Sequence, residues 1–224
     1  MRAAVYYAPN DLRMEDVETP EPGPGEILMK NISALTCGTD LKQYKRGYPK
    51  FKEGQKLIFG HESAGIVAKV GEGVTGFKVG DRIAPHNSAP CNKCYYCKIG
   101  EHSMCEDLTM VKSAWAEYRL LPAAIVRENV FHIPDHISFR SAALLEPLGS
   151  AVHGITDADI QLMDTVVING AGPLGLMMTK LAKLRGAYVI STDKNAKRLG
   201  VARELGADVT IDISETEDVV EAVK

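Results

Sequence analysis

Four cysteines within fifteen residues constrain this chain more than any other feature. They are Cys91, Cys94, Cys97 and Cys105, in the stretch C-N-K-C-Y-Y-C-K-I-G-E-H-S-M-C. Two-residue spacers allow thiolates to converge on one centre, and a structural zinc site made only of cysteines takes four of them in a tetrahedron. Because the protein supplies all four ligands, no position stays open for chemistry. We expect this zinc to hold a lobe of the fold together.

Two other structures also use closely spaced cysteines. Such crowded C-x-x-C runs are poor material for two unstrained disulfide bridges. Bacterial ferredoxins share the C-x-x-C-x-x-C spacing, but their fourth cysteine follows after three residues and precedes proline. Here the fourth follows after seven residues and precedes Glu106. The spacing therefore favours zinc over an iron–sulfur cluster.

A second set of metal-ligating side chains lies outside this lobe. Cys37 is the one remaining cysteine, and His61 follows it in G-H-E. Glu146 is the only charged residue between positions 141 and 149, immediately before Pro147. Taken singly, each is more often a core or surface residue. A catalytic zinc takes about three ligands from cysteine, histidine and carboxylate and leaves one position for water or substrate, and Cys37, His61 and a glutamate would meet that need.

The pattern of the first 135 residues predicts many short strands that are separated by glycine and proline residues. Antiparallel material of this kind favours a partly closed β-barrel. The strands are expected at residues 3–7, 26–35, 63–70, 116–121 and 130–133.

The pattern changes at Ser138, a plausible N-cap for a helix to Leu145. Pro147 suits the first turn of a second helix running toward Ile155 and should push Glu146 out of the α region, to a break between the two helices. From Thr165 strands and helices alternate, which predicts a parallel sheet. Strands are expected at 165–170, 188–192 and 208–212, helices at 173–185 and 195–205, and a further helix opened by a capping box of Ser214 and Glu217.

The run G-A-G-P-L-G lies between the first of these strands and the next helix, the context that a dinucleotide-binding motif requires. Gly170 would make the turn, Gly172 would let the backbone approach a pyrophosphate, and Gly175 would let helix and strand pack closely. The alternative is a glycine turn without a nucleotide. Asp193 ends the second strand, where a carboxylate can accept from adenosine ribose hydroxyls and repel a 2′-phosphate. The expected cofactor is therefore NAD rather than NADP, although Lys194, Lys197 and Arg198 soften that repulsion.

These motifs together resemble the medium-chain, zinc-dependent alcohol dehydrogenase family, in particular its polyol (sorbitol/iditol) and threonine dehydrogenase branch. The resemblance rests on C-G-T-D at Cys37, G-H-E at Gly60, the four-cysteine lobe, E-P-L at Glu146 and G-A-G-P-L-G at Gly170. It implies a GroES-like, partly closed β-barrel domain at 1–150, followed by a partial Rossmann domain, a doubly wound parallel sheet, at 151–224. A catalytic zinc would lie in the cleft between them.

The resemblance also implies roles for single residues. Cys37 and His61 would bind the catalytic zinc, with Glu62 or Glu146 as the carboxylate that coordinates it or stands behind a water. Thr39 would lie on the same side as Cys37 in an extended segment and would accept the alcohol proton first. Many members carry a histidine where this chain has Lys42, so proton exit through Lys42, Tyr44 or water stays open. The cofactor-binding residues would be Gly170, Gly172, Pro173, Leu174, Gly175, Asp193 and Arg198.

The implied activity is hydride transfer between a secondary alcohol (a polyol, sugar or threonine-like substrate) and NAD, with zinc lowering the pKa of the alcohol hydroxyl. We expect two zinc ions per chain, one catalytic and one structural, and a homo-oligomer in full-length relatives. The 224 residues hold only about half of a Rossmann unit, which predicts a truncated form with little turnover. A zinc-stabilised binding or assembly module without turnover is the alternative.

Composition limits the partners. The chain is 45% hydrophobic and 25% charged, with a formal net charge of −3 and no basic block, so no nucleic-acid partner is expected. No apolar run approaches the roughly 18 residues of a membrane span, and the N-terminus lacks a secretory signal core. Zinc-type cysteines in such a chain predict a cytoplasmic protein.

Overall fold

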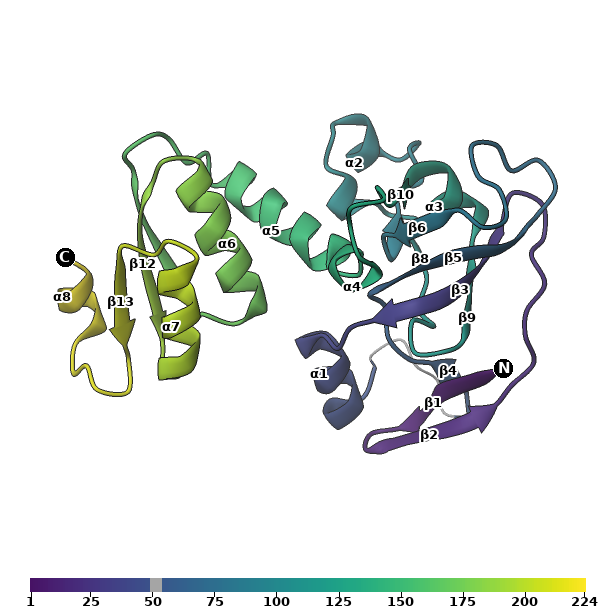
Figure 1. Cartoon of the computed structure of the whole chain (residues 1–224), viewed down its shortest axis with the longest axis horizontal. Coiled ribbons are helices and arrows are strands. Elements are labelled where there is room, and N and C mark those ends of the chain that lie inside the picture. Colours follow the sequence, from purple (N-terminus) through teal and green to yellow (C-terminus); the bar gives the residue numbers. More distant parts are fainter. Residues whose placement is uncertain (49–53) are drawn as a thin grey trace. The chain divides into compact units, whose positions relative to one another are not determined.

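A computed structural model describes residues 1–48 and 54–224 of the chain (Figure 1). The chain divides into two compact units, Met1–Glu146 and Pro147–Lys224. The sequence predicted a boundary after residue 150. Within the described residues, no helix combines the length and the apolar character that a membrane crossing needs.

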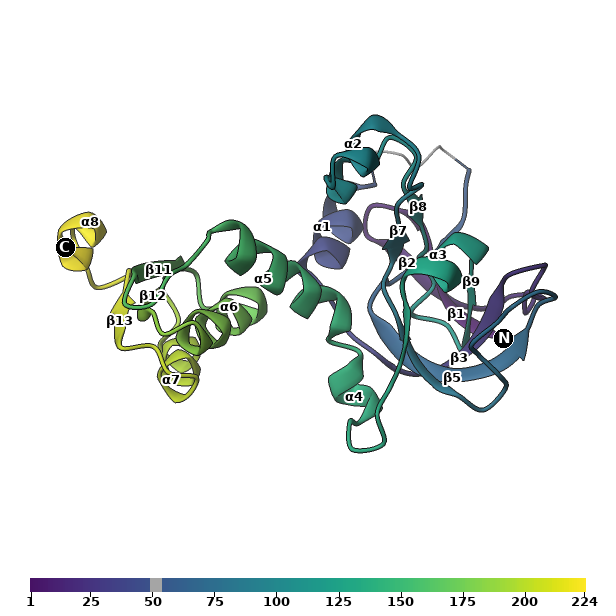
Figure 2. The same ribbon diagram turned by 90° about the horizontal axis from the view of Figure 1, so that it is seen from above.

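Antiparallel strands build the first unit. One sheet has the order β2-β1-β4, a second has the order β10-β6-β5-β3-β9, and β7 pairs with β8. The long strands β3 and β5 curve visibly in Figure 2. The strands are β1 (Arg2–Ala8), β2 (Asp11–Asp16), β3 (Ile27–Ala34), β4 (Leu57–Ile58), β5 (Ser63–Val70), β6 (Arg82–Pro85), β7 (Ser88–Ala89), β8 (Thr109–Met110), β9 (Tyr118–Leu121) and β10 (Val130–His132).

The segment 114–117 joins the two larger sheets. Ala4 N–H donates to Trp115 O at 2.8 Å, and Asn31 N–H donates to Glu117 O at 2.9 Å, so the segment pairs with β1 on one side and β3 on the other. The sheets therefore curve around one core, as a partly closed barrel does. Among the residues of that core are Ile27, Met29, Val67, Ile83, Leu121 and Ile125.

Short helices lie between the strands of this barrel or follow the last of them. They are α1 (Gly38–Arg46), α2 (Tyr95–Lys98), α3 (Ala123–Glu128), α4 (Phe139–Ala142) and the 3₁₀ helix η1 (His102–Met104). The helix α1 was not predicted, and α2 carries part of the four-cysteine stretch. Ser138 caps α4 as predicted, its Oγ accepting from Ser141 N–H at 3.1 Å, but the helix ends earlier than expected.

The predicted break at Glu146 is wrong. The helix α5 spans Leu145–Asp157, so the break falls at residues 143–144 and Glu146 lies within the first helical turn. The reason is that Pro147 follows directly in that same turn, where backbone N–H groups have no intrahelical partner and a proline costs nothing. The carboxylate is therefore fixed to a helix rather than to a flexible joint.

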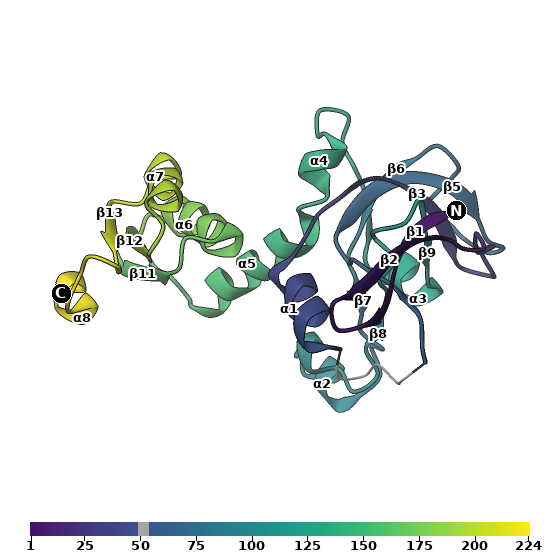
Figure 3. The same cartoon turned by 90° about the horizontal axis from the view of Figure 1, so that it is seen from below.

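The second unit contains a parallel sheet with the order β11-β12-β13. Its strands are β11 (Thr165–Asn169), β12 (Tyr188–Asp193) and β13 (Val209–Asp212), and its further helices are α6 (Pro173–Leu184), α7 (Ala196–Glu204) and α8 (Val219–Val223). Figures 2 and 3 show α6 and α7 side by side on one face of the sheet, as right-handed crossovers require. Small and branched residues fill the space between, among them Ala182, Val189, Leu199 and Ala202.

The predicted capping box at Ser214 is also wrong. The helix α8 begins at Val219 and is capped by Asp218, whose Oδ1 accepts from the N–H groups of Val220 and Glu221. Ser214 instead donates its hydroxyl to Asp212 Oδ1 at 2.6 Å. Aspartate is as good a cap as serine, and Asp218 stands closer to the apolar run.

Asp208 connects the helix layer to the sheet. Its Oδ2 accepts from Lys183 Nζ at 2.7 Å and from Val189 N–H at 2.6 Å. The Lys183 hydrogen bond, with the N–H of Val189 and the lysine charge, lowers the pKa of Asp208. A lowered pKa contributes stability that is present above the unfolded-state pKa, about 4, and is lost as pH falls through the folded-state pKa.

We expect Asp208→Asn to lower the free energy of unfolding at neutral pH by about 0.5–1 kcal/mol, because the charge-assisted hydrogen bonds are weakened and the exposed ion pair is screened by solvent. The deficit relative to wild type should shrink below about pH 4. Denaturant titrations at neutral and acidic pH measure it. Asp218→Asn is the control, since it removes the same charge from a cap where asparagine serves equally well. A deficit of equal size at both pH values would contradict the assignment.

Candidate metal centres and nucleotide loop

The four sulfur atoms of the cysteine lobe lie within 4.8 Å of one another. The Sγ–Sγ distance is 3.5 Å for Cys94 and Cys97, and 4.0 Å both for Cys91 and Cys97 and for Cys94 and Cys105. A tetrahedron with zinc–sulfur distances of about 2.3 Å has sulfur atoms about 3.8 Å apart. All five cysteines of the chain are free thiols, so no disulfide competes for them. The lobe fits a four-thiolate zinc.

Electrostatics within the lobe favour a cation. Backbone N–H groups of Cys97 and Glu106 lower the pKa of Cys94 to about 6. Burial, with hydrogen bonds from the neighbouring thiols, raises the pKa of Cys97 to about 12. One thiolate is thus stabilised by the backbone while its neighbour resists ionisation. Four thiolates at this spacing require a cation among them.

A second donor set comes from two distant parts of the sequence. Cys37 Sγ, a His61 ring nitrogen and a Glu62 carboxylate oxygen lie within 4.8 Å of one another. The helix α1 places the thiol, because Cys37 is its N-cap. Gly60 places the other two, because it adopts φ +78° and a Cβ there would lie 2.3 Å from Trp115 Cδ1. Sulfur, nitrogen and oxygen in this arrangement are the donor types of an open zinc site.

Asp40 completes this set, and the sequence interpretation missed it. Its side chain is 2% exposed, its Oδ1 lies 3.0 Å from His61 Nδ1, and its Oδ2 accepts from Cys37 N–H at 2.9 Å. This contact directs Nδ1 to the carboxylate and leaves Nε2 for a metal. The available signal was the fourth residue of C-G-T-D, a helix N3 position where an acidic side chain can close a capping box.

Burial and these contacts shift the ionisation of all three donors. Burial raises the pKa of the Cys37 thiol and of the Glu62 carboxyl. Burial alone would lower the pKa of His61, but the hydrogen bond and charge of Asp40 raise it overall. Without a cation the thiol and the carboxyl are therefore biased toward their neutral forms.

Glu146 and Thr39 are not among the three grouped donors. Glu146 is outside the three-donor group, and its Oε1 accepts from Asn87 Nδ2 at 3.0 Å. Thr39 is not in an extended segment, because α1 begins at Gly38. It is near Cys37 for a different reason, which is that its backbone N–H donates to the Cys37 sulfur at 3.4 Å, as N-cap geometry demands.

The glycine-rich loop has the shape that the motif predicts. Gly170 has φ +104°, and a Cβ on Gly175 would lie 1.8 Å from Gly170 O, so both positions exclude other residues. A Cβ on Gly172 would meet nothing within 4 Å, so the backbone there faces open space. Gly172 is the N-cap of α6 and Pro173 its first residue, and within the described chain no side chain caps the helix. Its first N–H groups can therefore hold a phosphate.

Asp193 fastens this loop to the sheet. The side chain is 7% exposed, its Oδ2 accepts from Ala171 N–H at 2.8 Å, and its Oδ1 accepts from Asn195 N–H at 2.9 Å. Arg198 Nη1 lies 3.8 Å from Oδ2. Each carboxylate oxygen keeps acceptor capacity beyond its backbone donor, so the group can hold the loop and still receive a ribose hydroxyl.

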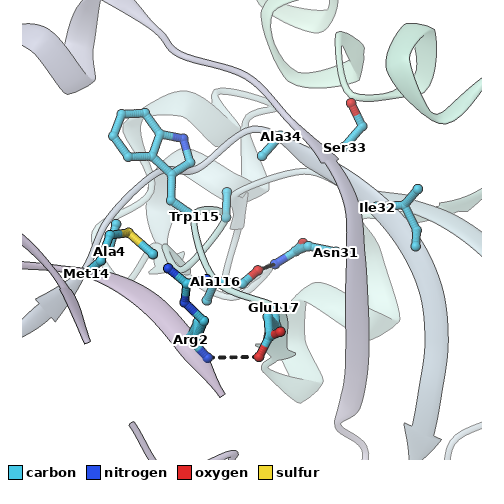
Figure 4. Close-up of a pocket in the computed structure, with 11 residues that line it drawn as sticks. Arg2, Ala4, Met14, Asn31, Ile32, Ser33, Ala34, Trp115, Ala116 and Glu117 are labelled. Carbon is cyan, nitrogen blue, oxygen red and sulfur yellow. Dashed lines mark hydrogen bonds between the residues drawn. The ribbon is translucent and has the colours of Figure 1, made fainter. Parts of the chain in front are cut away.

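A groove of about 540 Å³ lies elsewhere on the first unit (Figure 4). Its lining includes Arg2, Met14, Ile32, Trp115 and Glu117. None of the metal-binding, catalytic or nucleotide-binding residues predicted from the sequence lines this groove. The groove therefore does not contribute to either donor set.

Two stretches of the chain match known families. Residues 23–135 match the alcohol dehydrogenase GroES-like domain, and residues 173–224 match the zinc-binding dehydrogenases. The first match contains both donor sets, and Glu146 lies outside it. The second match begins at the first residue of α6.

Curated relatives of similar sequence are dehydrogenases. A sorbitol dehydrogenase of Bacillus subtilis is 35% identical over the whole of this chain, and an L-threonine 3-dehydrogenase of Pyrococcus furiosus is 39% identical over 93% of it. The chain spans 64% and 60% of the length of these two proteins.

Solved structures that resemble this chain are also dehydrogenases. An alcohol dehydrogenase of Escherichia coli complexed with NADH is 31% identical, with a TM-score of 0.88 over 99% of this chain and 65% of its own. A Sinorhizobium meliloti dehydrogenase bound to NADP is 32% identical, with a TM-score of 0.89 over 99% of this chain and 64% of its own. The predicted combination of a GroES-like barrel and a Rossmann-type domain is confirmed. The chain belongs to the medium-chain, zinc-dependent alcohol dehydrogenase family.

Proposed function

We propose that this protein is a zinc- and NAD-dependent oxidoreductase acting on secondary alcohols. The alcohol carbon gives a hydride to NAD⁺ and its hydroxyl gives up a proton, so that the products are a ketone, NADH and H⁺. The observation that carries the proposal is the donor set of Cys37, His61 and Glu62, which offers three ligands and leaves one tetrahedral position free.

The chain's own residues would prepare this site. Cys37, His61 and Glu62 would hold zinc, which when bound supplies a Lewis acid that lowers the pKa of an alcohol hydroxyl. Asp40 fixes the ring and tautomer of His61. The hydroxyl of Thr39, next to Cys37 on the exposed first turn of α1, is the proposed first acceptor of the alcohol proton.

The second unit would hold the nucleotide by its diphosphate and adenosine. The free N–H groups at the start of α6 suit the pyrophosphate, and the open space at Gly172 lets it approach the backbone. Pro173 and Leu174 form the first turn beside it, and Leu174 is partly exposed. Asp193 would receive the ribose hydroxyls and disfavour a 2′-phosphate, which supports NAD over NADP.

A polyol, sugar or threonine-like substrate is supported by the sorbitol and threonine dehydrogenases among the relatives. A zinc-stabilised binding module would keep the same metal sites but not the turnover. We therefore expect zinc-loaded protein in which these 224 residues are part of a complete nucleotide domain to reduce NAD⁺ in the presence of a polyol or of threonine, measured by the absorbance of NADH. His61→Ala should abolish that signal, because it removes a metal donor. NAD⁺ reduction that survives this change would contradict the proposed site.

Two zinc ions per chain are expected, with separable roles. Cys94→Ser should destabilise the cysteine lobe, because a structural zinc contributes directly to folding. Cys37→Ser should preserve the fold and remove only the second metal. Elemental analysis counts the ions, and circular dichroism during heating reports the fold. One zinc or fewer in carefully prepared wild type would refute the two-site assignment.

Asp193 is expected to select the nucleotide. Asp193→Ser should move the ratio of NAD⁺ to NADP⁺ affinity toward NADP⁺ by about tenfold or more, because it removes a negative charge and leaves Arg198 free to pair with a 2′-phosphate. Fluorescence titrations with both nucleotides measure the ratio. Because Asp193 also anchors Ala171, Asp193→Asn is the companion variant, which keeps an acceptor for that N–H. A wild type that already prefers NADP⁺ would refute this role of Asp193.

A further inference from the structure

We propose that Asn87 is a positioning residue that holds Glu146 away from the metal centre, so that Glu62 is the oxygen donor and one coordination position stays free. This inference rests on the proposed function, because it assigns a role to a residue near the Cys37–His61–Glu62 donor set. No motif pointed to Asn87, which lies between β6 and β7.

The contact between Asn87 and Glu146 is specific. Asn87 is 8% exposed, and its Nδ2 donates to Glu146 Oε1 at 3.0 Å. The structure groups Cys37, His61 and Glu62 as mutual neighbours within 4.8 Å and leaves Glu146 outside that group. Glu146 nevertheless influences the set electrostatically, since its charge acts on the pKa of both His61 and Glu62. Glu146 is therefore near enough to act on the donors by its charge, while its side-chain hydrogen bond is with Asn87.

Asn87 is itself held by a buried chain of hydrogen bonds. Its backbone O accepts from Val111 N–H at 2.8 Å, and Val111 O accepts from Arg119 Nη2 at 3.1 Å. Arg119 Nη1 donates to Ser63 Oγ at 3.0 Å, and Ser63 directly follows Glu62. The chain therefore runs from Glu146 through Asn87, Val111 and Arg119 to the neighbour of Glu62. The network thus links Glu146 to the residue that follows Glu62.

Arg119 gives that network a permanent charge. It is 0% exposed, and within residues 1–48 and 54–224 no carboxylate lies within ion-pair distance of it. Burial lowers the pKa of Arg119 to about 10 and the charge of Glu146 opposes that shift, so the guanidinium is protonated at neutral pH. The charges of Arg119 and Glu146 attract each other. Asn87 then supplies the directional contact that a charge alone does not.

The consequence concerns charge as well as space. A divalent cation with one thiolate and one carboxylate is electrically neutral, whereas a second carboxylate would make the centre anionic and would fill the fourth position. The hydrogen bond from Asn87 to Glu146 would therefore keep the metal centre electrically neutral and its fourth coordination position free for an alcohol.

Co(II) substituted for zinc makes the free position visible, because exogenous ligands alter the visible spectrum of Co(II) with an open site. Imidazole is the probe. The four-thiolate site is closed and does not respond, so the imidazole-induced change reports only the Cys37–His61–Glu62 centre. In Asn87→Ala, Glu146 should occupy the free position and weaken imidazole binding by about tenfold or more, the scale of one charge-assisted hydrogen bond.

Two further variants separate positioning from a structural defect. The double variant Asn87→Ala/Glu146→Gln should recover imidazole affinity to within about twofold of wild type, since the competing carboxylate is gone. Asn87→Leu keeps the side-chain volume without a donor and should behave like Asn87→Ala, which covers the case of a folding defect in the smaller variant. Asn129→Ala is the matched control, because its Nδ2 donates to the backbone O of Ser88 at 2.7 Å rather than to a carboxylate.

The outcomes distinguish the two levels of the proposal. A wild type without an imidazole-sensitive Co(II) centre would overturn the proposed function together with this inference. A wild-type centre whose imidazole affinity is unchanged in Asn87→Ala and Asn87→Leu, with both variants folded, would overturn the role of Asn87 alone. A weakened affinity that the Glu146→Gln change does not restore would also overturn it. Weakening with recovery in the double variant supports it.

Discussion

The carboxylate of Asp40 is the contact on which the candidate metal centre depends. One oxygen accepts from Cys37 N–H and so closes the first turn of α1, while the other lies against His61 Nδ1. The start of a helix and the orientation of a ring twenty-odd residues away are thereby set by the same buried group. Because an unpaired buried carboxylate would be costly, the helix cap and the ring cannot move independently. The residue that closes the first turn of α1 thus also fixes the geometry of the candidate metal centre.

How much of this could be foreseen depends on how local the information is. The four-cysteine lobe and the glycine-rich loop were predicted from spacing, because their residues are neighbours in the chain and their chemistry allows few alternatives. The strands at 63–70 and 188–193 follow from branched and apolar residues bounded by glycine or charge. The helix α1 was missed because its cap is a cysteine, and a thiol is not among the usual capping side chains.

The candidate site was only partly predictable for a related reason. Cys37 and His61 carry chemistry that a reader of the sequence can notice, but Asp40, Asn87 and Arg119 are ordinary residue types whose role arises from burial. Arg119 in particular lies in the edge strand β9, where an arginine would be expected in solvent. Its three hydrogen-bonded partners, two of them backbone carbonyl oxygens, exist only after β9 has folded against 111–112 and β5. No pattern in the sequence encodes those contacts directly.

The two donor sets differ in how the fold brings their candidate ligands together. In the cysteine lobe all four ligands come from fifteen consecutive residues, so folding of that stretch alone completes the coordination shell and closes it. The other set draws its donors from the cap of α1 and from the segment before β5, and its nearest spare carboxylate is tied to Asn87. A closed coordination shell needs only four ligands that lie close together. A shell with one free position also needs any other nearby ligand, such as a spare carboxylate, to be held away from the metal. An open site therefore needs contacts such as those between Asp40 and His61 and between Asn87 and Glu146, which hold side chains in place around the second set.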